Sequence, residues 1–113
     1  MSYPLCHQTV TVYRREQGGV SRQVFDGCFF EKTRIKQENG LGIGWENRFF
    51  LIMPGKEQRV FAGDKVYFGV GPEVTPEGWA GFSSACHEEV GEVAYATPCF
   101  WGGQLCHTEA GRK

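Results

Sequence analysis

Hydrophobic and polar residues alternate along much of the chain, which is the pattern of strands that place one face on a core. Residues 9–13 read Thr-Val-Thr-Val-Tyr, so Val10 and Val12 should point into a core and their neighbours away from it. Helix signals are scarce, because Gly or Pro interrupts almost every stretch longer than ten residues. The pattern therefore predicts a mostly β protein.

Two further strands are predicted over residues 20–25 and 28–35. Asp26-Gly27 lies between them and supplies the positive-φ position of either a tight turn or a β-bulge, and both interpretations stay open.

A near-continuous apolar run covers residues 48–53 and ends at Pro54, which fits a strand covered on both faces or placed at the centre of a small barrel. Residues 62–71 contain a turn that leads into another strand, and the last two strands are predicted over about residues 89–96 and 103–109. The fold class is therefore all-β: a small antiparallel β-barrel or sandwich of about six to seven strands with long loops, spanning residues 1–113 as a single domain. The predicted core consists of Val10, Val12, Phe30, Phe50, Ile52, Val66, Phe68 and Val93.

Two segments interrupt the strand pattern and are predicted as loops. Residues 37–47 carry glycine at 40, 42 and 44, which suits a flexible loop better than a strand interior, yet apolar residues stand between the glycines. This segment is either an ordinary hairpin loop folded back on the domain or a mobile apolar loop used at an interface. The second segment is a long Pro/Gly-rich connection over about residues 71–84. The interface candidates in the two loops are Leu41, Ile43, Trp45, Trp79 and Phe82.

Composition agrees with one β-rich domain, since 113 residues build one core, and 16 glycines with 14% aromatic residues favour turns and sheet packing. The apolar run at residues 49–53 is much shorter than the roughly 20 residues that span a bilayer. The beginning of the sequence, Met-Ser-Tyr-Pro, lacks the basic and apolar regions of an export signal, so we expect a cytoplasmic protein.

Charge is nearly balanced, with 12 Lys and Arg against 13 Asp and Glu, so a free monomer is not expected to wrap duplex DNA. Lys32, Arg34 and Lys36 nevertheless lie at two-residue spacing, and they share one face if the strand continues through them. This basic stripe is either a solvated strand face or a surface that faces the pore of a ring, where the number of subunits multiplies its charge.

Five cysteines are an odd number, and we expect free, reduced thiols. The dipeptide Cys-His occurs at residues 6–7, 86–87 and 106–107, and thiolate with imidazole is a natural zinc set. Neighbouring residues in a strand point to opposite faces, however, and the chain has no Cys-x-x-Cys pair. No metal and no other cofactor is therefore expected, while a site assembled from different strands stays open.

Catalytic motifs are missing from the sequence. Ser83-Ser84 lies in Gly-Phe-Ser-Ser-Ala and not in a Gly-x-Ser-x-Gly elbow, and the phosphate-binding loop motif is absent. Glu88-Glu89 would alternate faces on a strand, which does not suit an acid/base pair. An enzyme is not expected, and only the number of Cys and His residues favours a thiol-dependent or zinc enzyme.

Several short motifs occur in a recognisable order: the strand at residues 9–13, a Gly-Cys strand near residue 28, the glycine-rich loop, an apolar strand ending at Pro54, Gly-Asp-Lys-Val at residues 63–66, and Trp-Gly-Gly-Gln-Leu-Cys-His-Thr-Glu-Ala-Gly at residues 101–111. In this order they resemble the small minor capsid proteins encoded in the head-to-tail region of tailed phages and prophages of Gram-positive bacteria. The resemblance spans nearly the whole chain.

The resemblance implies a head-closure (stopper) or head-tail joining protein, a small β-barrel that forms a homo-oligomeric ring, six- or twelve-fold, beneath the phage portal and adaptor proteins. Such a ring would retain packaged DNA in its pore and dock the tail terminator or other tail proteins. It would form in the cytoplasm of the host bacterium and end in the neck of the virion, without contact with a membrane. By its character alone, the loop at residues 37–47 matches a pore-gating loop.

An alternative is a stand-alone β-barrel module of SH3 or OB type that binds a peptide or an oligonucleotide. Its contact residues would be the exposed aromatics among Trp45, Trp79, Phe82 and Trp101. A module should be a monomer, whereas a ring protein should form oligomers alone or on its portal complex.

Overall fold

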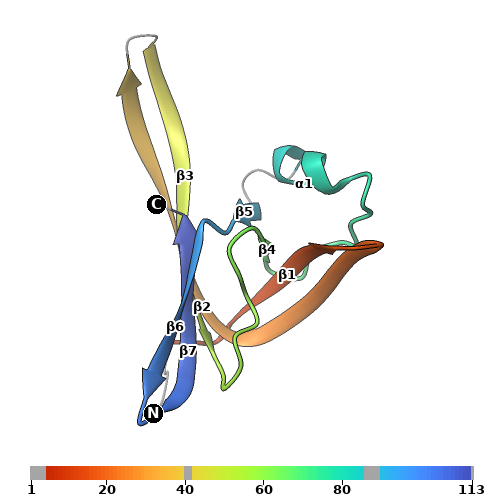
Figure 1. The fold of residues 1–113 in the computed structure, drawn as a ribbon. Coiled ribbons are helices and arrows are strands. Elements are labelled where there is room, and N and C mark those ends of the chain that lie inside the picture. The colour runs from red at the N-terminus through yellow and green to blue at the C-terminus, as the bar shows by residue number, and fades with distance from the viewer. Residues whose placement is uncertain (1–4, 40–41, 86–89, 113) are drawn as a thin grey trace.

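The computed structural model describes residues 5–39, 42–85 and 90–112, which form one curled antiparallel sheet of seven strands and one short helix (Figure 1). The order of strands across the sheet is β5-β4-β1-β2-β3-β7-β6. The predicted all-β class is confirmed, and the curled sheet has the shape of a half-barrel. The strands are β1 (Gln8–Glu16), β2 (Gly19–Asn39), β3 (Gly42–Pro54), β4 (Lys65–Phe68), β5 (Val90–Glu92), β6 (Tyr95–Trp101) and β7 (Gln104–Arg112), and the helix is α1 (Trp79–Ala85).

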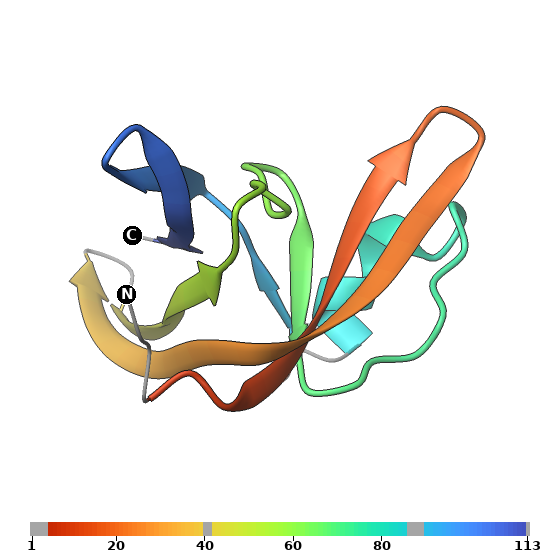
Figure 2. The same cartoon turned by 90° about the horizontal axis from the view of Figure 1, so that it is seen from below.

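The 21-residue strand β2 belongs to both halves of the sheet, and it pairs with β1 in its first half and with β3 in its second (Figure 2). Where the halves meet, one residue of β1, Thr9, stands opposite two of β2, Asp26 and Gly27, and Gly27 has a φ of +71°. This is a β-bulge, so the bulge and not the turn is the correct interpretation of Asp26-Gly27. Residues 20–25 and 28–35 consequently belong to one strand and not to two. A bulge bends its strand, which helps the sheet to curl.

The main core is enclosed by the curled sheet, with residues from β1, β2, β3, β4 and β7. Of the predicted core residues, Val10, Val12, Val66 and Val93 are buried, and Phe30 and Phe68 pack partly buried against them. The prediction was wrong for Phe50 and Ile52, which are only half-buried, because the inward residues of β3 are Phe49, Leu51 and Met53.

The error has a physical reason. Every residue from 49 to 53 is apolar, so the sequence carries no period-two signal that tells the two faces of β3 apart. In the structure, β3 pairs with β7 from Phe49–Arg112 to Pro54–His107, and in this register Phe49, Leu51 and Met53 face the core.

The half-barrel nearly closes where β5 approaches β3. A Cβ atom on Gly91 of β5 would lie 2.5 Å from Cε1 of Phe49, so only glycine allows this approach. The chain then crosses to the other half of the sheet, where the amide of Ala94 donates a hydrogen bond of 2.8 Å to the carbonyl of Gly111. The predicted strand over residues 89–96 is therefore two strands, β5 and β6. Pro98 interrupts strand signals in β6 but is compatible with a strand at the edge of a sheet.

The predicted loop at residues 37–47 is corrected by the structure, because β2 continues to Asn39 and β3 begins at Gly42. The ladder between them runs through the pair Asn39–Gly42. The alternation of glycine with Ile43 and Trp45 is thus a strand alternation, and glycine is tolerated because a ladder needs only the backbone groups. Leu41 lies outside the described residues.

This hairpin projects from the body of the protein (Figure 1). In the described part of the chain, β7 pairs with β3 only from Phe49 onward, so residues 42–48 pair with β2 alone. We call residues 33–39 and 42–48 the arm. With the arm, the molecule measures 49 × 35 × 22 Å along its principal axes.

The second predicted loop, at residues 71–84, ends in the helix α1, which covers the face of the sheet that points away from the main core. Phe82 of α1 packs edge-on against Tyr13 of β1, with ring centroids 4.8 Å apart. None of the helices in the described residues is long and apolar enough to cross a membrane.

Candidate functional site

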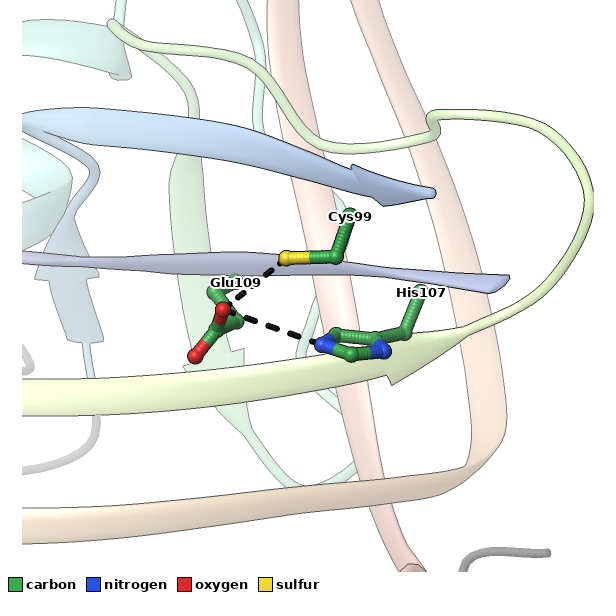
Figure 3. Close-up of side chains that lie close together, drawn as sticks. All are labelled: Cys99, His107 and Glu109. Atoms are coloured by element: carbon green, nitrogen blue, oxygen red, sulfur yellow. Dashed lines mark hydrogen bonds and ion pairs between the residues drawn. The ribbon is translucent and has the colours of Figure 1, made fainter. Parts of the chain in front are cut away.

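Three side chains that can bind a metal ion meet on the β6–β7 hairpin, where Cys99 comes from β6, and His107 and Glu109 come from β7 (Figure 3). Cys99 lies directly opposite His107 in the ladder, so the two side chains leave the sheet on the same face. Glu109 follows His107 by two residues and shares that face as well. One donor atom of each residue lies within 4.8 Å of the other two.

The carboxylate of Glu109 stands between the other two groups. The Cys99 thiol donates a hydrogen bond of 2.9 Å to Oε2 of Glu109, and Nε2 of His107 lies 3.7 Å from the same oxygen. The hydrogen bond to Glu109, followed by partial burial and the negative charge of the carboxylate, raises the pKa of Cys99 to about 11. Without a competing ligand, the thiol is therefore protonated at neutral pH.

The local sequence of the hairpin positions this cluster. Gly102 and Gly103 form its turn with φ values of +61° and +78°, which only glycine adopts at low cost. The register shifts between Cys99–His107 and Phe100–Leu105, so Cys106 is an extra residue without a direct partner. This bulge lies next to the cluster, and Cys106 is not one of its members.

Sequence reasoning looked for ligands within the three Cys-His dipeptides and did not single out Cys99. Alternation correctly separates Cys106 from the face of His107, and the dipeptide at residues 86–87 lies outside the described residues. In the first dipeptide, Cys6 is half-buried while His7 is exposed and contacts the carbonyl of Leu5 at 3.0 Å. A usable signal existed: His-x-Glu on one strand, with a cysteine on the preceding strand of a Gly-Gly hairpin. The expectation that no metal binds stays a prediction. It was based on the opposite directions of neighbouring side chains in one strand, which does not apply to metal ligands that come from two strands.

The thiols also bear on redox state. Cys6, Cys28, Cys99 and Cys106 are free in the structure. Burial raises the pKa of Cys28 to about 12, so this thiol acts as a small core side chain.

The basic positions Lys32, Arg34 and Lys36 lie at the base of the arm and along it. They stand opposite Phe49, Asn47 and Trp45, and β2 runs unbroken through all three. Because the strand is continuous, these three positions alternate with their neighbours and belong to the same face of β2. Lys32 is exposed, and its Nζ lies 5.3 Å from the centroid of the Phe68 ring. The side chains of Arg34, Lys36, Ile43 and Trp45 are outside what the structure describes.

The aromatic interface candidates separate into buried and exposed residues. Phe82 is 6% exposed and belongs to a core cluster with Tyr13, so it is not available as a surface contact. Trp79 is half-buried, and Nζ of Lys65 lies 4.7 Å from the centroid of its ring. Trp101 is 73% exposed and its neighbour Phe100 is 64% exposed, both at the tip of the β6–β7 hairpin. Sequence reasoning missed Phe100, because an apolar residue next to a turn gives no sign of its exposure.

Comparison of the chain with protein-family models, with curated proteins and with solved structures finds no match.

Proposed function

We propose that this protein is a structural component of a phage head-tail connector, either a head-closure (stopper) or a head-tail joining protein, and not an enzyme. The observation that carries the proposal is the presence of two projecting contact elements at opposite ends of one sheet. The arm leaves one end, and the tip of the β6–β7 hairpin, with Phe100 and Trp101, leaves the other (Figure 1). A protein that joins two assemblies needs two separate contact surfaces of this kind.

The arm supports assembly with other chains. A two-stranded hairpin is at best marginally stable in water by itself, and the arm has no third strand in the described part of the chain. Neighbouring subunits of a ring would supply a surface on which the arm packs. The order of sequence motifs, which resembles that of minor capsid proteins, supports the same proposal.

The basic stripe is compatible with packaged DNA in the pore of such a ring. One subunit has a net charge of -1, so a monomer lacks the net positive charge that sequence-independent DNA binding needs. A ring repeats Lys32, Arg34 and Lys36 in every subunit around one axis, and the local field then grows with the number of subunits. The partners in this proposal are the portal or adaptor protein on one side and the tail terminator or other tail proteins on the other. Assembly would take place in the cytoplasm of the host bacterium, and the ring would remain in the virion neck.

The arm provides the test. In a variant, residues 35–46 are replaced by Asn-Gly, so that Arg34 and Asn47 flank a two-residue turn in the existing register. A phage genome that carries this variant should produce filled heads that lose DNA or lack tails, as counted by electron microscopy and plaque titre. The control is Gln17→Asn, which places Asn-Gly in the turn of the β1–β2 hairpin and should leave the titre unchanged. Normal titres with the shortened arm would contradict the proposal.

The stripe is tested by charge. Lys32→Ala combined with Lys36→Ala should reduce DNA retention in tailless heads, measured by nuclease sensitivity. Arg15→Ala combined with Lys56→Ala removes the same charge from exposed positions elsewhere, and it should leave retention unchanged. Equal effects of the two pairs would mean that the stripe does not face DNA.

The alternative function is a stand-alone SH3- or OB-like module, and the exposed Phe100 and Trp101 favour it. In that case the purified monomer should bind an oligonucleotide or peptide, and Trp101→Ala should abolish this binding. The two functions are separated by size measurements with a portal complex, to which a connector protein adds as a ring.

A further inference from the structure

The cluster on the β6–β7 hairpin has the composition and the geometry of a transition-metal site. From the usual bond lengths of zinc to sulfur, nitrogen and oxygen, the donor atoms of a tetrahedral site lie about 3.3 to 3.8 Å apart. In this protein, Sγ of Cys99 is 2.9 Å and Nε2 of His107 is 3.7 Å from Oε2 of Glu109. Small side-chain rotations would therefore bring all three atoms to bonding distance of one ion.

We infer that Cys99, His107 and Glu109 bind one divalent transition-metal ion, and that zinc fits this ligand set best. A thiolate and an imidazole favour zinc over magnesium or calcium, which prefer oxygen ligands. Three protein ligands leave a fourth position for water or for a donor from another chain. All three side chains are half-buried, so an ion can reach them from solvent while part of its surroundings is protein.

The binding step balances without a redox partner. The divalent ion replaces the proton of the Cys99 thiol, which is released to solvent, and a metal–sulfur bond forms. The hydrogen bond from the thiol to Glu109 is lost, and the carboxylate oxygen then binds the same ion.

The position of the site suggests its structural effect. In the described part of the chain, β6 is an edge strand that pairs only with β7. An ion held by Cys99 of β6 and by His107 and Glu109 of β7 would link the two strands immediately beside the exposed Phe100 and Trp101. Metal binding would thus hold this contact surface in one conformation. The inference concerns the isolated chain and does not depend on the proposed connector function.

The test uses cobalt(II) as a spectroscopic probe on the full-length, reduced and metal-free protein. Cobalt should bind with one ion per chain and give a sulfur-to-cobalt charge-transfer band with the visible absorption of a tetrahedral site. Zinc should displace the cobalt and raise the melting temperature of the protein. No thiolate band, or a stoichiometry far below one, would overturn the inference.

Variants assign the ligands. Loss of an outer partner of a metal ligand typically weakens binding about 10- to 100-fold, so loss of a ligand should weaken it at least as much. We expect this for Cys99→Ser, His107→Ala and Glu109→Gln, each checked for an unchanged circular dichroism spectrum. Cys106→Ser is the matched control, because it removes the neighbouring thiol of the same hairpin and should retain the band. If the band survives Cys99→Ser and disappears in Cys106→Ser or Cys86→Ser, a different set of thiols holds the ion and the inference is wrong.

Discussion

The two halves of β3 have the same partner on one side and different surroundings on the other. Residues 49–54 lie between β2 and β7, whereas residues 42–48 pair with β2 alone among the residues that the structure describes. In residues 49–54, the side chains of Phe49, Leu51 and Met53 are buried in the main core. Residues 42–48 alternate glycine with Ile43 and Trp45 at their start, and they project from the body.

The comparison shows that continuous backbone pairing does not by itself make a segment part of the stable body. Ladder hydrogen bonds are exchanged for bonds to water on unfolding and contribute little net free energy, while buried apolar area contributes most of it. We therefore expect the free energy of unfolding to depend strongly on residues 49–54 and weakly on the arm. An extension that the body does not need is available for contact with other chains.

The largest effect is expected at Leu51, which is fully buried. Leu51→Ala should lower the free energy of unfolding by about 2 to 5 kcal/mol, because it removes apolar contacts and leaves a cavity. Ile52→Ala, one position along the same strand, should cost clearly less, because Ile52 is only half-buried. Urea denaturation of both variants measures the difference. Equal losses would show that the two faces of β3 are equally buried and would remove the basis of the comparison.

Leu51 also marks how far the sequence predicts the fold. Alternation predicted the inward positions Val10 and Val12, because the polar residue Thr11 stands between them. The same rule gave no answer for residues 49–53, where both faces are apolar. The hairpin at residues 37–47 was predicted as a loop, because the cost of glycine in a strand outweighed the alternation of its neighbours.

The candidate site was missed for a related reason. Cys99 and His107 are eight positions apart, and they become neighbours only through the register of the β6–β7 hairpin and its bulge. The spacing of residues within a dipeptide carries no information about this pairing between strands. The Gly-Gly turn at residues 102–103 would have allowed the register to be approximated, and the bulge then shifts it by one residue.

The next largest effect should come from a buried polar contact in the body. The carboxylate of Asp64, with a side chain 4% exposed, accepts hydrogen bonds of 3.0 and 2.9 Å from Arg14 and one of 2.9 Å from the amide of Phe61. Asp64→Ala should cost about 1 to 3 kcal/mol, because it removes a buried, charged acceptor from three hydrogen bonds. The control is Glu57→Ala, whose exposed ion pair with Arg59 is 3.7 Å long and should contribute about 0 to 1 kcal/mol. If both variants unfold at the same urea concentration, the Asp64 contacts do not stabilise the body.

A smaller effect concerns the second projecting hairpin, where the Cys99 thiol donates a hydrogen bond to Glu109 beside the tip. The pKa of Cys99 is raised to about 11, so its thiol reacts slowly at pH 8. Glu109→Gln removes the main cause and should accelerate alkylation of Cys99 in the metal-free protein, by about threefold per pKa unit once the lower nucleophilicity of a more acidic thiol is included.

The same shift predicts a pH dependence. A raised pKa favours the protonated thiol in the folded state, so its contribution to stability is complete below the ordinary pKa of 9.0 and is lost as the pH rises toward about 11.

The alkylation rate of Cys99 in Glu109→Gln is measured by mass spectrometry of the peptide that contains Cys99, with Glu57→Gln as the control. A rate that is the same in Glu109→Gln and in the unaltered protein would show that the thiol and the carboxylate do not interact in solution.

The smallest effect on stability is expected for the shortened arm, in which Asn-Gly replaces residues 35–46. The replacement keeps the pairs from Phe29–Ile52 to Arg34–Asn47 and removes none of the residues in the main core. A change of less than about 0.5 kcal/mol corresponds to less than about 4 °C in melting temperature for a domain of this size. We therefore expect a melting temperature within about 4 °C of that of the unaltered protein, measured by circular dichroism, even where the same variant fails in particle assembly. A large decrease would mean that the arm packs on the body in solution, so that the two halves of β3 would share one stabilising role and the arm would not be free for contacts with other chains.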